Sequence, residues 1–256
     1  MAAKKKPAKK SHQPAAPPAS PTGYWQQTMR PLVSLVFVLP MLAAYEGGIL
    51  ALGPQAAHNG AAIWLQNALS TLGLGQYVLL PVVTCAALLG MHYVSRQPWK
   101  FSPWVLGGML VESIVLAVFL VVIFRGYSAV LGSLSARVGL AATGDDVGQV
   151  LGYFGAGIYE ELLFRLLLLS LISAIVQAAG APQRASLITA IFVSSVVFAA
   201  AHYELFTASG LPFAWRTFFF HTLCGIYFGT VYVLRGFGIA AGSHAFYDVL
   251  VFARLF

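Results

Sequence analysis

The chain has 256 residues, of which 59% are apolar and 9% are charged, and its formal net charge is +7. An average soluble domain carries about a quarter charged residues, so this composition excludes a soluble enzyme, a disordered protein and a fibrous protein. It indicates a polytopic membrane protein. Five of the fifteen Lys and Arg residues lie within the first ten positions, and the other ten nearly balance the eight acidic residues. We therefore expect no nucleic acid as a partner.

Residues 1–23 combine five lysines with five prolines and several alanines. They offer too little apolar surface to fold, so we expect a disordered tail. A Lys-rich flank marks the cytoplasmic side of a first hydrophobic helix, and anionic lipid headgroups attract it. The stretch 31–52 is long enough to span a membrane, so we expect no removal of a signal peptide.

The apolar stretches predict an all-α fold, a polytopic bundle of transmembrane helices. A span needs about twenty mainly apolar residues. Seven stretches are strong candidates: 31–52, 77–94, 104–124, 147–178, 186–203, 216–234 and 237–253. An eighth, 56–74, mixes polar and apolar residues and suits a helix that lies in the interface. The bundle thus has seven or eight spans, and the cationic residues of the loops divide four against four in either topology, so charge does not choose between them.

We divide the chain into the tail (1–23), an N-terminal set of helices with the amphipathic segment (24–146) and a C-terminal set (147–256). The expected location is the inner or plasma membrane of a cell, with several spans and a cytoplasmic N-terminus. Cys85 and Cys224 lie in apolar stretches and are predicted to pack there, without forming a disulfide or a metal site.

Two acidic residues and one arginine lie in the middle of the apolar stretch 147–178: Glu160, Glu161 and Arg165. An ionised side chain inside a span costs at least ~2.5 kcal/mol on insertion scales. Glu161 and Arg165 are four residues apart, a favourable spacing for a helical ion pair, whereas Glu160 points about 100° away around the helix. We infer that Arg165 neutralises one carboxylate and that the other can act as a base. The alternative is a purely structural ion pair.

Two later stretches carry histidines at one-turn spacings. His202 follows Phe198 by four residues, and Asp248 follows His244 by four residues. Taken alone, His202 fits an interfacial histidine, and the second pair fits a local hydrogen bond as well as a functional one. His221 is interpreted as structural, with lining of the cavity as the alternative. Taken together, a carboxylate base and two imidazoles are the groups that activate water and stabilise an oxyanion, and they converge inside bundles.

The three motifs resemble those of the CPBP intramembrane proteases, which include the CAAX prenyl endopeptidases of the Rce type and bacterial immunity-associated homologues. The family's motifs Glu-Glu-x-x-x-Arg, Phe-x-x-x-His and His-x-x-x-Asn/Asp correspond to Glu160, Glu161 and Arg165, to Phe198 and His202, and to His244 and Asp248. The resemblance covers roughly residues 147–253, and it implies that Arg165 orients Glu161.

The resemblance further implies a glutamate-dependent endopeptidase of the membrane. Glu160 would be the base that activates water, with His202 helping to hold it. His244 and the residue at position 248 would stabilise the oxyanion. Prenyl-processing members typically have Asn where this chain has Asp248. A carboxyl group donates a hydrogen bond only when protonated, so Asp248 either holds a proton or orients His244.

Several alternatives stay open. A zinc-dependent membrane protease would use Glu160, His202 and His244 as ligands; the chain lacks the His-Glu-x-x-His spacing, so we disfavour zinc and expect no cofactor. A non-catalytic scaffold or bacteriocin-immunity-type protein would use the polar cluster to hold helices together, and a transporter could use the same groups. Gly225 and Gly229 form a small-x-x-x-small pair that lets helices approach. The expected partners are a peptide or protein substrate, prenylated or not, and bilayer lipids.

Overall fold

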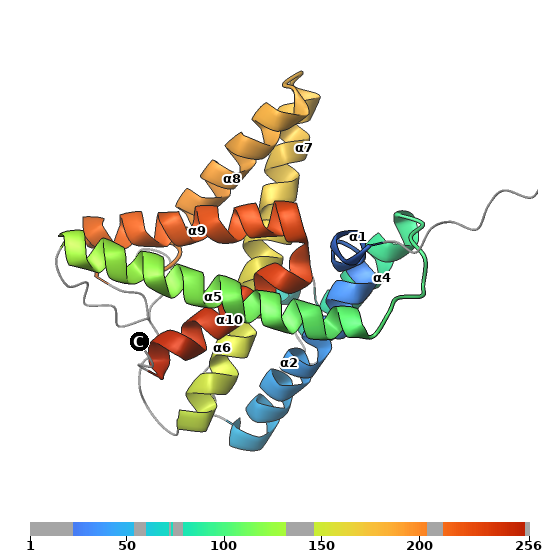
Figure 1. The fold of residues 1–256 in the computed structure, drawn as a ribbon, viewed down its shortest axis with the longest axis horizontal. Helices are drawn as coiled ribbons and strands as arrows, with labels where there is room; N and C mark the ends of the chain where they lie inside the picture. Colours follow the sequence, from blue (N-terminus) through green and yellow to red (C-terminus); the bar gives the residue numbers. More distant parts are fainter. Residues whose placement is uncertain are drawn as a thin grey trace, which may run out of the picture.

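The computed structural model describes residues 23–53, 60–71, 73, 79–131, 146–203 and 212–253, and its elements are helices. The predicted all-α fold is confirmed over these ranges, whereas nearly all of the tail 1–23 lies outside them. The helices are α1 (Tyr24–Thr28), α2 (Pro31–Leu52), α3 (Gly60–Thr71), α4 (Leu79–Val94), α5 (Trp104–Leu131), α6 (Asp146–Glu161), the π-helical segment η2 (Leu162–Leu169), α7 (Ser170–Ala178), α8 (Gln183–Ala200), α9 (Trp215–Arg235) and α10 (Phe237–Phe252) (Figure 1).

Five of the seven predicted strong spans are confirmed as helices long and apolar enough to cross a membrane. They are Pro31–Leu52, Trp104–Val130, Val147–Ala178, Gln183–Ala200 and Trp215–Arg235. The chain is therefore a multi-pass integral membrane protein. The predicted spans 77–94 and 237–253 form the 16-residue helices α4 and α10. At 1.5 Å per residue each is about 24 Å long, short of a hydrocarbon core of about 30 Å.

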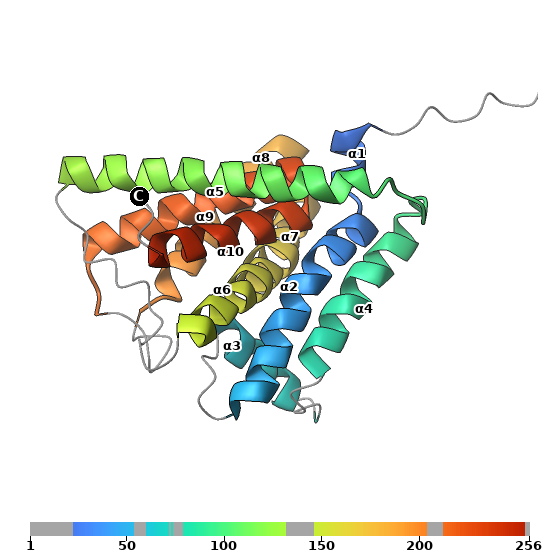
Figure 2. The same cartoon turned by 60° about the horizontal axis from the view of Figure 1, so that its bottom comes forward.

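Helix α10 is short because it is the central helix of the bundle. It packs against α2, α5, α6 and α9, and Figure 2 shows it running between α5 and α6. Eleven of its sixteen residues are buried, among them Gly238, Ala240, Ala241 and Gly242. A helix that is apolar all round belongs inside protein. The predicted stretch 237–253 is thus a helix of the bundle core, shorter than the five helices that have the length of a span.

The amphipathic segment 56–74 contains α3, whose 12 residues are too few to cross. The connection after α4 returns to the start of α2, where Arg30 donates a hydrogen bond to the Lys100 carbonyl at 3.1 Å and Gln27 accepts one from the Ser102 amide at 3.0 Å. Helices α2 and α4 pack together and run in opposite directions. The start of α2 and the end of α4 therefore lie at the same end of the bundle.

A buried polar cluster ties α1 to α5 and α9. Arg235 binds Glu112 through two hydrogen bonds of 2.5 and 2.8 Å, and Tyr24 donates a third to the same carboxylate at 2.6 Å. The guanidinium also lies 3.5 Å from the centre of the Trp25 ring. Burial, and then the bond to Glu112, raise the pKa of the Tyr24 phenol, so it remains a donor. Every charge here has a partner, as a structural role requires.

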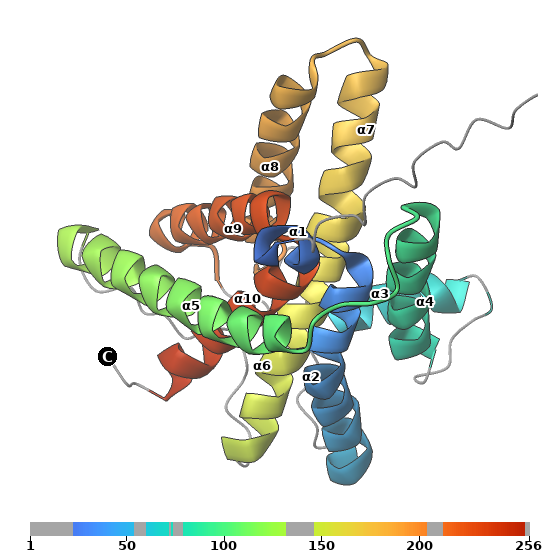
Figure 3. The same cartoon turned by 45° about the vertical axis from the view of Figure 1, so that its right-hand side comes forward.

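Helices α7 and α8 form a hairpin that extends from the rest of the bundle (Figure 3). The two helices pack against each other, and α8 also packs along α9. Gly225 of α9 makes this contact close, because a Cβ at that position would lie 2.7 Å from the Ser195 Cβ of α8. Gly229 faces Ile191 at an ordinary 3.4 Å. The predicted pair of small residues therefore has one member that close packing requires and one that it does not.

Candidate active site

Helices α6 and α10 approach backbone to backbone at Gly157. A Cβ there would lie 2.6 Å from the Ala241 carbonyl oxygen and 2.8 Å from the Ala245 nitrogen. Only glycine permits this approach. Gly157 is one turn before Glu161, and Ala245 directly follows His244. The crossing therefore places the acidic pair of α6 against the imidazole of α10.

The acidic pair, the arginine and the last motif meet in one cluster. His244 Nδ1 lies 2.8 Å from Glu161 Oε1, and its Nε2 lies 3.7 Å from Glu160 Oε2 and 3.6 Å from Asp248 Oδ2. Arg165 Nε lies 3.1 Å from Glu161 Oε2, which confirms the predicted ion pair. Five of the six predicted site residues are thus brought together by α6, η2 and α10.

The two neighbouring glutamates differ in exposure. The Glu161 side chain is 0% exposed and the Glu160 side chain 12%. Because a carboxylate only accepts hydrogen bonds, the His244 nitrogen that meets Glu161 carries a proton. The other ring nitrogen then faces Glu160 and Asp248. Glu161 thereby fixes the orientation of the ring, as a partner of a functional histidine does.

The charges of these five residues do not balance. Three carboxyl groups face one guanidinium and one imidazole, so the set carries a net charge of −1 even when His244 is protonated. A buried net charge is expensive. Neutrality of these five groups would require one further proton on a carboxyl group. The cluster is therefore built to hold a proton close to the partly exposed carboxylate.

The chain forms a π-helical turn directly after Glu161, from Leu162 to Leu169. Such wide turns are rare, and they are frequent at functional sites. The turn carries Arg165, whose Nη2 atom donates to the Gly225 carbonyl at 3.3 Å and whose guanidinium lies 4.4 Å from the centre of the Phe198 ring. A fully buried arginine is thus held by a carboxylate, a carbonyl and an aromatic face.

One face of α9 contacts the cluster, which the sequence pattern did not predict. His221, Gly225 and Phe228 follow one another at spacings of four and three, so they share a face of the helix. The Phe228 ring stacks on His244 with centroids 4.4 Å apart and planes at 13°. The carbonyl of Gly225 accepts the bond from Arg165. In the sequence, this face is indicated by the i, i+4, i+7 spacing of the three residues, which ordinary membrane helices show too.

His202 lies beside the cluster, behind the Phe198 ring. Its ring centroid is 4.7 Å from that of Phe198, which in turn is 6.0 Å from that of His244. His202 Nδ1 lies 2.8 Å from the Phe198 carbonyl oxygen. Since a carbonyl only accepts, this nitrogen carries a proton.

His221 stacks on His202, with centroids 4.3 Å apart and planes at 26°. Its Nδ1 atom is buried and has no hydrogen-bond partner among the described residues. His221 therefore contacts a motif residue directly.

The zinc alternative finds no fitting donor set in the described part of the chain. No three His, Cys, Asp or Glu side chains of these ranges are grouped to hold a metal ion, and this includes Glu160, His202 and His244. The predicted packing of the two cysteines is confirmed, because Cys85 packs against one apolar cluster and Cys224 belongs to another.

Comparison with known protein families identifies the region that carries the cluster. Residues 147–250 match the family described as type II CAAX prenyl endopeptidase Rce1-like. In comparisons with curated proteins and with solved structures, nothing matched the chain. The matched region runs from α6 to α10 and includes every residue of the three motifs. The family resemblance of the motifs is confirmed: this chain carries, at residues 147–250, an Rce1-like domain of the type II CAAX prenyl endopeptidase (CPBP) family.

Proposed function

We propose that the protein is an intramembrane endopeptidase in which Glu160 activates the water that attacks a peptide bond. Family membership implies a CAAX-type intramembrane protease and a protein substrate. The observation that carries the assignment to Glu160 is the contrast between the two glutamates: Glu161 is enclosed between Arg165 and His244, whereas Glu160 keeps exposed surface. A base must reach its water, and an enclosed carboxylate cannot.

The reaction would proceed in two proton transfers. Glu160 takes a proton from water while the water oxygen bonds to the carbonyl carbon, and the carbonyl oxygen becomes an oxyanion. His202 lies behind the Phe198 ring and would act on the site through that ring. When the carbon–nitrogen bond breaks, Glu160 returns the proton to the leaving amine. The products are a carboxyl group and an amine, and the base is restored.

His244 and Asp248 would stabilise the oxyanion. The bond to Glu161 turns His244 Nε2 toward the same space as Asp248, 3.6 Å away. When the ring is protonated, Nε2 donates to the oxyanion. A protonated Asp248 donates a second bond, and the unbalanced charge of the cluster supports such a proton. Donors aimed at the developing charge are usually the largest single contribution to catalysis.

The proposal is tested with purified protein in lipid vesicles and fluorogenic peptides with and without a prenyl group. Glu160→Gln should lower kcat about 100-fold to 10,000-fold, the contribution of general acid–base catalysis, with an unchanged unfolding transition. Glu112→Gln is the matched control, because it alters an intramembrane carboxylate outside the cluster; it breaks the pair with Arg235 and so lowers stability, but the protein that remains folded should cleave at the unaltered rate. An unchanged rate for Glu160→Gln would overturn the assignment of the base.

Two further measurements separate the alternatives. A strong chelator should leave peptide cleavage unchanged; loss of activity that zinc restores would favour a metalloprotease. A biological function that survives Glu160→Gln would instead favour a non-catalytic scaffold. Ion flux in vesicles without peptide cleavage would favour a transporter.

We also propose that the N-terminal tail lies in the cytoplasm, where its lysines meet anionic headgroups. Lys100 lies near the start of α2, where Arg30 donates a hydrogen bond to its carbonyl, whereas α6 begins at the other end of α2, where Leu151 packs on Gly48. A cysteine at position 100 should react with an impermeant thiol reagent from the cytoplasmic side only. A cysteine in place of Val147 should react from the opposite side only.

A further inference from the structure

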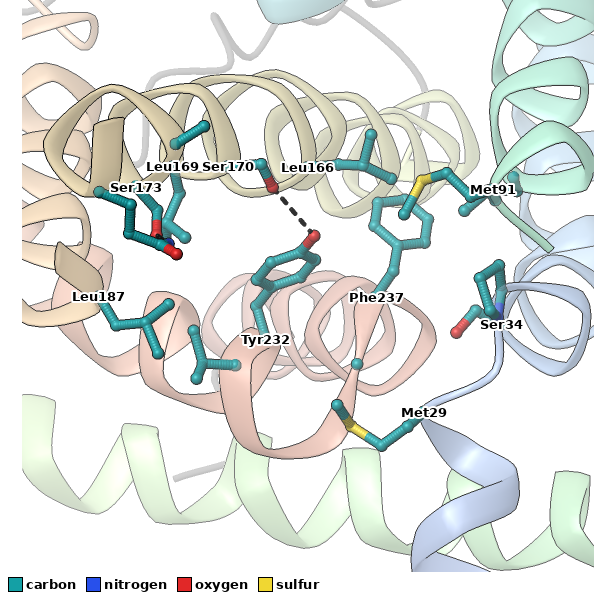
Figure 4. Close-up of a pocket in the computed structure, with 16 residues that line it drawn as sticks. Met29, Ser34, Met91, Leu166, Leu169, Ser170, Ser173, Leu187, Tyr232 and Phe237 are labelled. Atoms are coloured by element: carbon teal, nitrogen blue, oxygen red, sulfur yellow. Dashed lines mark hydrogen bonds between the residues drawn. The ribbon is translucent and has the colours of Figure 1, made fainter. Parts of the chain in front are cut away.

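A cavity of about 660 Å³ lies beside the candidate active site, on the other side of η2. Its walls come from the start of α2, from α4, from η2 with α7, from α8 and from the α9–α10 turn (Figure 4). None of the six predicted site residues lines it. Its size falls within the range of about 300–1,000 Å³ that is usual for ligand sites.

The lining divides into an apolar wall and a neutral polar stripe. Leu88, Met91 and Phe237 belong to the apolar wall, and none of the sixteen lining residues is charged. The stripe is formed by Ser170, Ser173 and Gln177 of α7, whose spacings of three and four place them on one face of that helix. A cavity without charge inside a membrane protein disfavours ionic ligands. It suits a hydrocarbon chain that carries a neutral acceptor.

The stripe retains hydrogen-bond donors toward the cavity. The Gln177 amide donates one hydrogen to the Ser173 hydroxyl at 3.0 Å and has a second hydrogen to offer. Gln177 lies next to the end of α7, whereas Ser170 lies two turns deeper and meets the Tyr232 hydroxyl at 3.5 Å (Figure 4). This arrangement fits a ligand whose hydrogen-bond acceptor lies at Gln177 and whose apolar chain runs along α7 toward Ser170.

The rim of the cavity is apolar and exposed. Met91 on the rim is 40% exposed, and the outer faces of α7 and α8 carry Leu171 and Ile188 at 57% and 68% exposure. Exposed apolar side chains of spanning helices face lipid. We propose that the cavity is a lipid site that binds one acyl chain of a phospholipid of the surrounding bilayer, with the ester carbonyl at Gln177 and Ser173. The proposal does not depend on the peptidase assignment.

The bound chain contacts the two segments that carry the candidate site. Leu166 lines the cavity and directly follows Arg165. The Ser170 hydroxyl lies 3.4 Å from the Arg165 carbonyl oxygen, and Tyr232 is one turn beyond Phe228 on α9. Van der Waals contact with the chain therefore supports the π-helical turn from the side opposite the cluster.

The test uses the full chain in phosphatidylcholine vesicles that contain a small fraction of phosphatidylcholine with a photoreactive diazirine in one acyl chain. After irradiation, mass spectrometry locates the labelled residues. In the unaltered protein we expect adducts to concentrate on Leu166, Ser173 and Ala174 over the outward Leu171 of the same helix. Equal labelling of Ala174 and Leu171 would mean ordinary boundary lipid and would overturn the proposal.

Ala174→Trp fills the cavity, and Leu171→Trp is the matched control on the lipid face of α7. The first should lower adducts at Leu166 about tenfold, which corresponds to about 1.4 kcal/mol of binding free energy, and the second should leave them unchanged. Unchanged labelling of Leu166 in Ala174→Trp would overturn the site. Displacement of the label by a prenylated peptide but not by excess unlabelled phospholipid would also overturn it, because the cavity would then belong to the substrate.

Discussion

Replacing Arg165 by methionine tests whether the ion pair with Glu161 holds the polar cluster together. Methionine keeps much of the length of the side chain and removes the guanidinium. The Glu161 carboxylate, which is 0% exposed, would lose its 3.1 Å partner and keep only the 2.8 Å bond from His244. The Gly225 carbonyl would lose its bond as well.

Breaking a buried ion pair by removing one partner costs about 3–5 kcal/mol, because the other charge stays buried without compensation. We therefore expect Arg165→Met to lower the free energy of unfolding by about 3–5 kcal/mol. Glu161→Gln should be costly for the same reason. The double variant removes both charges. Its loss of unfolding free energy should therefore be about 2–3 kcal/mol smaller than the sum of the losses in the two single variants, which is the upper part of the range for residues in contact.

The assay is reversible unfolding by sodium dodecyl sulfate in mixed micelles, followed by circular dichroism. Arg184→Met is the control, because Arg184 is exposed at the start of α8 and its loss should change the free energy by no more than about 0.5 kcal/mol. A loss below about 1 kcal/mol for Arg165→Met, or additive single losses, would show that the pair does not hold the cluster.

Three further predictions use the same preparation. Gly225→Ala should cost about 1–3 kcal/mol of stability by overpacking against α8, while Gly229→Ala, with ordinary contacts, should be nearly neutral; equal costs would refute the packing argument. Gly157→Ala should lower the rate of peptide cleavage by the protein that remains folded, because it separates α6 from α10; an unchanged rate per folded protein would contradict this. His221→Phe should keep the ring stack on His202 and the activity, whereas His221→Leu should lower kcat about tenfold at unchanged KM, equivalent to ~1.4 kcal/mol; equal activities would contradict a positioning role.

Most helices could be predicted from the sequence because their signal is local. The stretch 31–52 corresponds to α2 over its whole length, and 216–234 to α9 within one residue at each end. The pairs of residues one turn apart could also be predicted, since a spacing of four residues brings Glu161 next to Arg165 on any helix. The stretch 237–253 corresponds to α10 within one residue, but its local sequence does not reveal that neighbouring helices bury most of its surface.

Contacts between helices could not be predicted, because they depend on how the helices cross. The contact of His244 with Glu161 depends on the approach of α6 to α10 at Gly157. Nothing in a run of leucines indicates the π-helical turn at Leu162–Leu169. Phe198 and His202 are one turn apart and contact each other locally, whereas the contact of the Phe198 ring with His244 results from packing between helices.

The balance of intramembrane charges nevertheless distinguishes the structural ion pair from the candidate active site. Glu112 meets Arg235 one to one, through two hydrogen bonds, and a tyrosine completes the acceptor. The candidate site has three carboxyl groups against two cationic groups. A structural pair has no reason to carry an excess acid, because an unbalanced charge in a bundle is costly and gains nothing in packing. The excess is visible in the sequence, as two adjacent glutamates with one arginine, and it is the feature that a proton-transferring site requires.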